Sequence, residues 1–167
     1  MALWFMRLAV CAAAIGVASS SSTQAQNFEL GGKICAGSLS SANGPGGASA
    51  IAFVRGQNGE LSARLYFSPG QAAKEAMMRA VAAGTPDIRG LRDLGDAARV
   101  QVTGHIVTFE RHGPDPRTGA QVVFRSFRFE YTGGSMNGTS APVNDVMEDG
   151  RPGATTHMLL TCLAGQR

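Results

Sequence analysis

The sequence predicts an α+β fold, in which an antiparallel, curled β-sheet of five to six strands carries one main helix at residues 68–83. Strand-like segments follow one another through turn sequences, with a single helical pattern between them, and this order is typical of the class. Two cysteines, Cys35 and Cys162, lie near the ends of the chain that remains after a predicted leader is removed. A disulfide between them would join the first and last strands, which favours a curled sheet over a flat one.

Residues 1–25 have the pattern of a signal peptide. One basic residue, Arg7, precedes an apolar run at 8–18, and Thr23 and Ala25 place small residues at the two positions that a signal peptidase reads. We therefore expect cleavage after Ala25 and export. The strong preference for Arg over Lys is typical of a GC-rich genome and favours a bacterial protein of the periplasm or the medium.

Two alternatives to cleavage fit the leader less well. Its apolar run is shorter than the roughly 20 residues that a membrane-spanning helix needs. A lipidated Cys11 would follow the bulky Val10 and would have almost no apolar core before it. Since no later apolar stretch could cross a bilayer, residues 26–167 are expected to form a single exported domain with no transmembrane segment.

Removal of the leader takes away Cys11 and leaves two cysteines in an oxidising compartment. Cysteines in that setting are expected to pair, so we predict a Cys35–Cys162 disulfide rather than two buried free thiols. The bond requires the two Cα atoms to come within about 7 Å. The first and last strands should therefore be neighbours in the sheet or face each other across the core.

The first half of the exported chain predicts a strand, a loop and a hairpin. A short strand is expected at 33–36, followed by a loop of small and polar residues at 37–48. Residues 49–55 and 61–67 form the clearest hairpin, because apolar and polar residues alternate along the second arm. Asn58-Gly59 between the two arms favours a tight type I′ turn.

A helix is expected directly after this hairpin. Ser68 suits the N-cap, Pro69 the first helical position, and Gln71 could close a capping box with Ser68. Small apolar side chains around Met77 form a narrow stripe that can lie close to a sheet. Gly84 is placed to end the helix in the left-handed conformation.

The next two segments are harder to interpret. Residues 85–98 predict either a short, imperfect helix or a crossing rich in turns, because glycines interrupt the helical spacing. Residues 99–111 predict one long strand, whose apolar residues change phase at Gly104. A β-bulge at Gly104 would let both halves point their apolar residues inward.

The last third of the chain predicts two more strands. Residues 121–131 alternate in phase and should pair antiparallel with the preceding strand across a turn-rich connection. Residues 133–152 are rich in Gly, Ser and Asn and are expected to be a second connection. Residues 153–163 then form the final strand, which contains Cys162.

Several classes of function are not indicated. The net charge of +3 falls to +2 when Arg7 is removed, too weak an excess to indicate a nucleic-acid partner. No glycine-rich phosphate-binding motif follows a strand, and the three histidines lack the spacing of metal ligands, so we expect neither a metal nor another cofactor. The GxSxG motif of many hydrolases is also missing, so the sequence does not favour an enzyme.

The most promising functional feature is a surface on the predicted hairpin of residues 111–128. Arginines beside aromatic rings suit an anionic or sugar-like ligand, or an acidic protein. The simpler alternative is that these arginines only keep the hairpin soluble. The candidate binding surface consists of Arg111, Arg117, Phe124, Arg125, Arg128 and Tyr131.

We therefore predict a binding or inhibitory module for an envelope protein or a small ligand. One alternative is a secreted hydrolase that uses His157 and a loop hydroxyl from Ser135, Thr139 or Ser140. Another alternative is a structural component of the envelope with no discrete ligand.

Overall fold

Antiparallel strands build most of the molecule in the computed structural model, which describes residues 29–42, 44–143 and 153–165. The predicted leader, residues 1–25, lies outside these ranges. The strands and the long helix, in chain order, are β1 (Lys33–Ser41), β2 (Gly44–Arg55), β3 (Leu61–Pro69), α2 (Gln71–Ala82), β4 (Arg92–Asp96), β5 (Ala98–Thr103), β6 (Ile106–Pro114), β7 (Gln121–Tyr131), β8 (Ser135–Pro142) and β9 (Thr156–Ala164).

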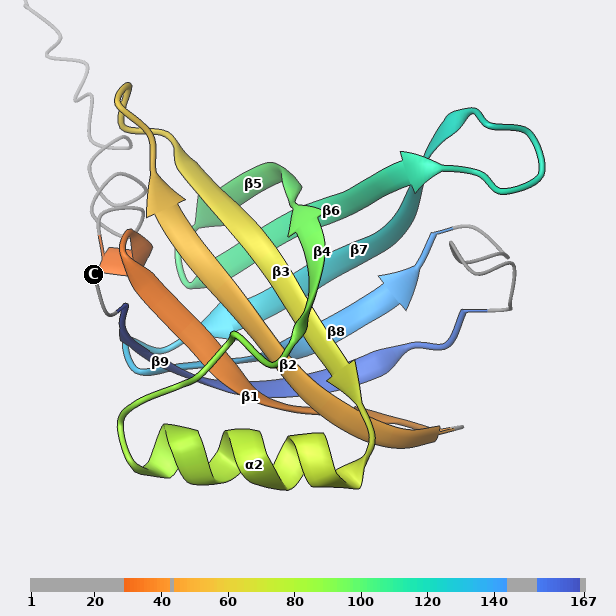
Figure 1. Ribbon diagram of the computed structural model, residues 1–167. Helices are drawn as coiled ribbons and strands as arrows, with labels where there is room; N and C mark the ends of the chain where they lie inside the picture. Colours follow the sequence, from red (N-terminus) through yellow and green to blue (C-terminus); the bar gives the residue numbers. More distant parts are fainter. Residues whose placement is uncertain (1–28, 43, 144–152, 166–167) are drawn as a thin grey trace, which may run out of the picture.

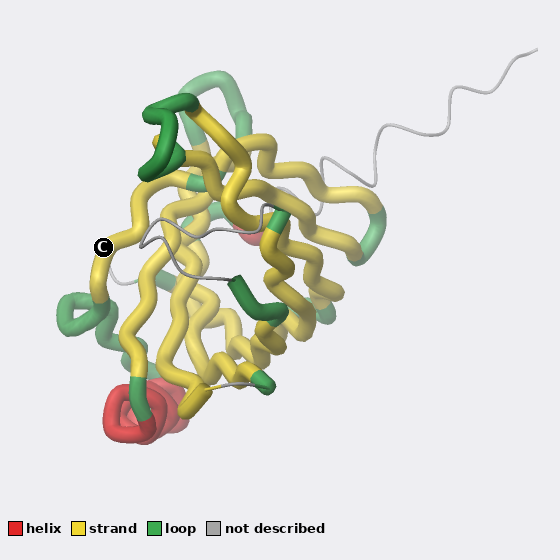
Figure 2. The backbone as a smooth tube through the Cα atoms, turned by 90° about the vertical axis from the view of Figure 1, so that its right-hand side faces the viewer, coloured by secondary structure: helices red, strands yellow, loops and turns green. Residues whose placement is uncertain are grey.

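These strands form one sheet that curls into a nearly closed barrel. Their order is β4-β3-β2-β1-β9-β8-β7-β6-β5, so the two edge strands, β4 and β5, are separated along the chain by Ala97 alone. Strand β4 pairs with β3, β5 pairs with β6, and β5 also approaches β3. Both edges of the sheet therefore lie in one kinked segment, and the sheet curls around until they meet (Figures 1 and 2).

The predicted antiparallel sheet with one main helix is confirmed, but the expected number of five to six strands is wrong. Residues 37–48, predicted as a loop, extend β1 to Ser41 and begin β2 at Gly44. Helix α2 covers the outer face of these strands, where Ala36, Ala48 and Ala50 are fully buried. Strands buried on both faces lose the alternation of apolar and polar residues that identifies a strand in a sequence.

The segment 99–111, predicted as one long strand, belongs to the hairpin of β5 and β6. Gly104 has a φ of 59° and forms a two-residue turn with His105 between the paired residues Thr103 and Ile106. Glycine with positive φ at the first turn position is what a type II′ turn requires. The change of apolar phase at Gly104 therefore marks a chain reversal and not a bulge, and His105 in the turn is exposed.

The hairpin of β2 and β3 is confirmed, although its turn differs from the predicted type. Only Gly59 has positive φ, at 82°, whereas a type I′ turn needs positive φ at Asn58 as well. The Gly59 N–H donates to the carbonyl of Gly56 at 3.0 Å, which makes a tight turn that ends in a left-handed glycine.

Helix α2 begins at Gln71, three residues later than predicted, and ends at Ala82, one residue before the predicted end. Pro69 belongs to β3, and the N-cap is Gly70 with a φ of 98°, so the predicted capping box does not form. At the other end Gly84 has a φ of 73°, as its left-handed role requires. Met77 is buried between the helix and the outer face of β1 and β2. The helix thus packs on the outside of the barrel (Figure 1).

Two predicted irregular segments contain strands. Strand β4 lies within 85–98, and β8 lies within 133–152. In β8 the inward-facing positions carry Met136, Gly138 and Ser140, of which only Met136 is large. A Cβ atom added at Gly138 would lie 2.1 Å from the carbonyl oxygen of Arg128. Strands β7 and β8 therefore approach each other closely because this residue is glycine.

We expect Gly138→Ala to lower the free energy of unfolding by about 1–3 kcal/mol, the usual cost of overpacking. The added methyl group would also lie 2.7 Å from Phe129 Cα, so the backbone itself must shift. Gly134→Ala is the matched control, because nothing lies within 4 Å of its added Cβ. Urea titrations of both variants test this expectation, which equal midpoints for the two variants would contradict.

The predicted disulfide is confirmed. Cys35 and Cys162 are directly opposite each other in the register of β1 and β9, and the bond closes a sequence separation of 127 residues. Both cysteines are buried in the barrel core. The bond therefore links the first and last strands where they pair. Without this strand pairing the sheet would not curl back on itself.

The core fills one end of the barrel more completely than the other. At the end that holds the β2–β3, β5–β6 and β7–β8 turns, which we call the closed end, Leu30 and Tyr131 are buried. Above them Phe109 stacks on Phe127 and Phe129, with ring centroids 4.7 and 5.8 Å apart. The opposite end, which holds the β6–β7 turn, is the open end.

Candidate functional site: a cavity in the open end of the barrel

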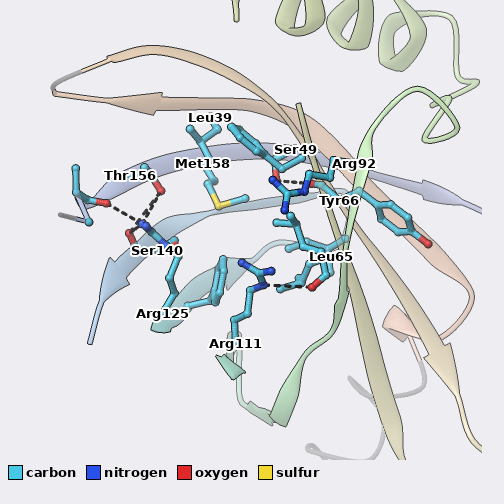
Figure 3. A pocket seen from close by; sticks show the side chains of 16 residues that line it. Leu39, Ser49, Leu65, Tyr66, Arg92, Arg111, Arg125, Ser140, Thr156 and Met158 are labelled. Atoms are coloured by element: carbon cyan, nitrogen blue, oxygen red, sulfur yellow. Dashed lines mark hydrogen bonds between the residues drawn. The ribbon is translucent and has the colours of Figure 1, made fainter. Parts of the chain in front are cut away.

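A cavity of about 520 Å³ lies in the open end, lined by residues from β1, β2, β3, β4, β6, β7, β8 and β9 (Figure 3). Its volume lies within the range of about 300–1,000 Å³ that is typical of small-molecule sites. The apolar part of the lining includes Leu39, Ile51, Leu65, Leu94, Phe127 and Met158. Its polar side chains include Ser49, Ser140, Thr156, Arg92, Arg111 and Arg125.

Small inward-facing residues nearest the open end on three strands leave room for the cavity. They are Ser49 on β2, Ser140 on β8 and Thr156 on β9, whereas Phe53, Met136 and Leu160 face inward on the same strands nearer the closed end. Since β4 and β5 share one segment, the barrel is about eight strands around. A barrel of that width can be filled by side chains or can hold one small ligand.

Arg111 and Arg125 meet at the mouth of this cavity, because the register of β6 and β7 places them directly opposite each other. Arg125 is held in place by hydrogen bonds. Its Nε donates to Ser140 Oγ at 2.5 Å, and its Nη2 donates to the carbonyl oxygens of Ser140 and Ala154, each at 2.8 Å (Figure 3).

The electrostatic environment of Arg125 is unusual. Burial, and after it the positive charge of Arg111, lowers the pKa of the Arg125 guanidinium. Both causes disfavour the charged form, although a guanidinium stays protonated at neutral pH.

Arg111 and Arg92 complete the arginine side of the cavity. Arg111 Nε donates to the carbonyl oxygen of Leu94 at 3.2 Å, which ties β6 to the edge strand β4. Arg92, also on β4, lines the cavity and is exposed. In the described part of the lining, all charged side chains are thus arginines.

The residues predicted as one binding surface do not lie together. Arg111 and Arg125 lie directly opposite each other and face the cavity, inside the barrel mouth and not on an outer surface. The other four residues lie elsewhere: Arg117 is in the β6–β7 turn, Arg128 is exposed on the outer side of β7, and Phe124 and Tyr131 are buried.

Sequence reasoning missed Arg92 and the hydroxyl groups of Ser49 and Thr156. These residues come from three strands that are distant along the chain, and only the register of the sheet brings them to one level. The decreasing size of the inward-facing residues in β2 was the one available signal, and it has meaning only once those residues are known to form a strand.

The histidines lie outside the lining of the cavity. His105 is in a turn, and His112 and His157 are exposed. His157 is paired in register with Thr139 on the outer side of the sheet, whereas Ser140 faces the cavity. Within the described ranges, no three His, Cys, Asp or Glu side chains gather as metal ligands would.

Comparison with models of protein families, with curated proteins and with solved structures finds no match to this chain. Among the described residues, no helix has both the length and the apolar character needed to cross a bilayer. Evidence on function therefore comes from the chemistry of the cavity.

Proposed function

We propose that the protein is an exported binding module that takes a small, largely apolar molecule into the open end of its barrel. The observation that carries this proposal is the cavity of about 520 Å³ with its mostly apolar lining. The mouths of β-barrels are common sites for such ligands. A disulfide supports the export part of the proposal, because disulfides persist in oxidising compartments.

The packing of the rest of the barrel supports a ligand in this place. Protein interiors are normally close-packed, and the closed end follows that rule, with Leu30, Phe53 and Phe129 almost fully buried. The open end instead combines small inward-facing residues on three strands. A ligand would cover the apolar surface that stays exposed beside these small residues. Each Å² of apolar surface removed from water contributes about 25 cal/mol of favourable free energy.

The neutral fluorophore N-phenyl-1-naphthylamine is a direct test, because its emission rises in apolar surroundings. We expect the oxidised protein to bind it, and Leu39→Trp to weaken binding at least about tenfold, or about 1.4 kcal/mol, by filling the cavity. Fluorescence titration gives both affinities. A protein that leaves the emission unchanged would contradict the proposal.

Leu159→Trp is the matched control for this experiment. Leu159 lies on β9, adjacent in sequence to the residue that pairs with Leu39, and it is 57% exposed on the outer side of the barrel. The same substitution therefore adds the same ring on the other side of the barrel wall. Equal losses of affinity in the two variants, with unchanged melting temperatures, would show that the fluorophore binds elsewhere.

A further inference from the structure

The mouth of the cavity combines an apolar lining with two guanidinium groups, and this combination indicates what kind of molecule would fit. Arg125 precedes Phe127 by two residues on β7, so both side chains face inward, with the arginine nearer the open end. A molecule whose apolar part lies against Phe127 and Met158 would thus have one end beside Arg125 and Arg111.

We infer that the ligand is an anionic amphiphile, whose apolar body fills the cavity and whose negatively charged group is bound by Arg111 and Arg125. This inference rests on the proposed function, and it adds the charge and the orientation of the ligand. A carboxylate, a phosphate and a sulfate share the required chemistry, because each presents several oxygen acceptors to guanidinium donors.

The site for the anionic group is built before any ligand arrives. The hydrogen bonds from Nε and Nη2 of Arg125 to Ser140 and Ala154 fix the plane of its guanidinium group. Arginine otherwise loses considerable side-chain freedom when it binds a ligand, and prior fixation reduces that loss. The hydroxyl of Thr156, 3.4 Å from Arg125 Nη2, adds a polar group at the same level.

The positive charges at the cavity mouth also favour an anionic ligand. Two arginines at directly paired positions of neighbouring strands repel each other, and like charges opposite each other destabilise a sheet. An anion between them would offset this repulsion and the effect of burial on Arg125. Arg92 on β4 extends the positive charge around the rim of the cavity.

Displacement of bound N-phenyl-1-naphthylamine by decyl compounds, each below its micelle concentration, tests the inference. The probes are decanoate, decyl phosphate, decyl sulfate, the neutral 1-decanol and the cationic decyltrimethylammonium. We expect at least one anion to bind about tenfold or more tightly than 1-decanol, and the cation to bind more weakly than 1-decanol. The order among the three anions then identifies the preferred head group.

Variants of two arginines on the same hairpin assign the effect to the cavity mouth. We expect Arg111→Gln to weaken binding of the best anion about 10- to 100-fold, the usual worth of a hydrogen bond to a charged group, and to leave 1-decanol unchanged. Arg128→Gln is the matched control, because Arg128 is exposed on the outer side of β7. Arg125 is left intact because its removal would strip the carbonyl oxygens of Ser140 and Ala154 of a donor.

The outcomes separate the inference from the proposed function. If the fluorophore binds and 1-decanol competes as well as every anion, the inference of an anionic group is wrong, while the proposal of an apolar binding site is retained. If Arg111→Gln and Arg128→Gln weaken the anion equally, the assignment to the cavity mouth is wrong. If the fluorophore does not bind at all, the proposed function itself fails.

Discussion

Replacing both Cys35 and Cys162 with alanine is expected to lower the free energy of unfolding by about 4–5 kcal/mol. The bond spans 127 residues, so its loss releases most of the unfolded chain from a long closed loop. Small domains have a total stability of about 5–15 kcal/mol, so a loss of this size would leave the barrel marginal. Urea titration of the oxidised protein and the double variant measures the difference.

Reduction supplies the control for this prediction. Dithiothreitol should bring the unfolding midpoint of the unaltered protein close to that of the double variant, and it should not move the midpoint of the variant. Equal midpoints for the oxidised protein and the double variant would show that pairing of β1 with β9 alone accounts for closure of the barrel.

Phe129→Ala should lower the free energy of unfolding by about 3–5 kcal/mol, the usual loss when a fully buried phenylalanine is truncated. Its ring stacks on Phe109 and packs over Gly138, so neighbouring side chains cannot easily fill the space. Val54→Ala, at a side chain that is 55% exposed, should change stability by no more than about 0.5 kcal/mol. A loss below about 1 kcal/mol for Phe129→Ala in urea titration would contradict the packing described here.

Those parts of the fold that depend on local patterns could be predicted from the sequence. The alternation in 61–67 identified β3, and the capping glycine Gly84 identified the end of α2. The disulfide was predicted because only two cysteines remain once the leader is removed. Prediction failed where side chains are small. In β8 the tight approach of β7 requires Gly138, and its neighbours Ser135 and Thr139 resemble loop residues, so the strand has little apolar signal.

Only one pair of residues in the candidate site, Arg111 and Arg125 on a single hairpin, was predictable from the sequence. A hairpin between 99–111 and 121–131 was expected, and its register decided that Arg111 lies opposite Arg125. Whether this pair faces water or the barrel interior depends on closure of the sheet, which is set by pairing of β9 with β1, more than a hundred residues apart. No local pattern in a single sequence encodes that closure.

The start of the first strand and the end of the last strand lie close together, so the order of the strands along the chain could be changed. The N–H of Gly165 donates to the carbonyl oxygen of Gly32 at 2.8 Å, so a short peptide could link these two points. The chain could then be opened at the β6–β7 turn, giving a circular permutant in which every strand remains whole. In that permutant Cys35 and Cys162 would be close neighbours along the chain, and their bond would restrict the unfolded ensemble far less. The contribution of this disulfide is thus set largely by where the polypeptide is cut and only in part by its surroundings.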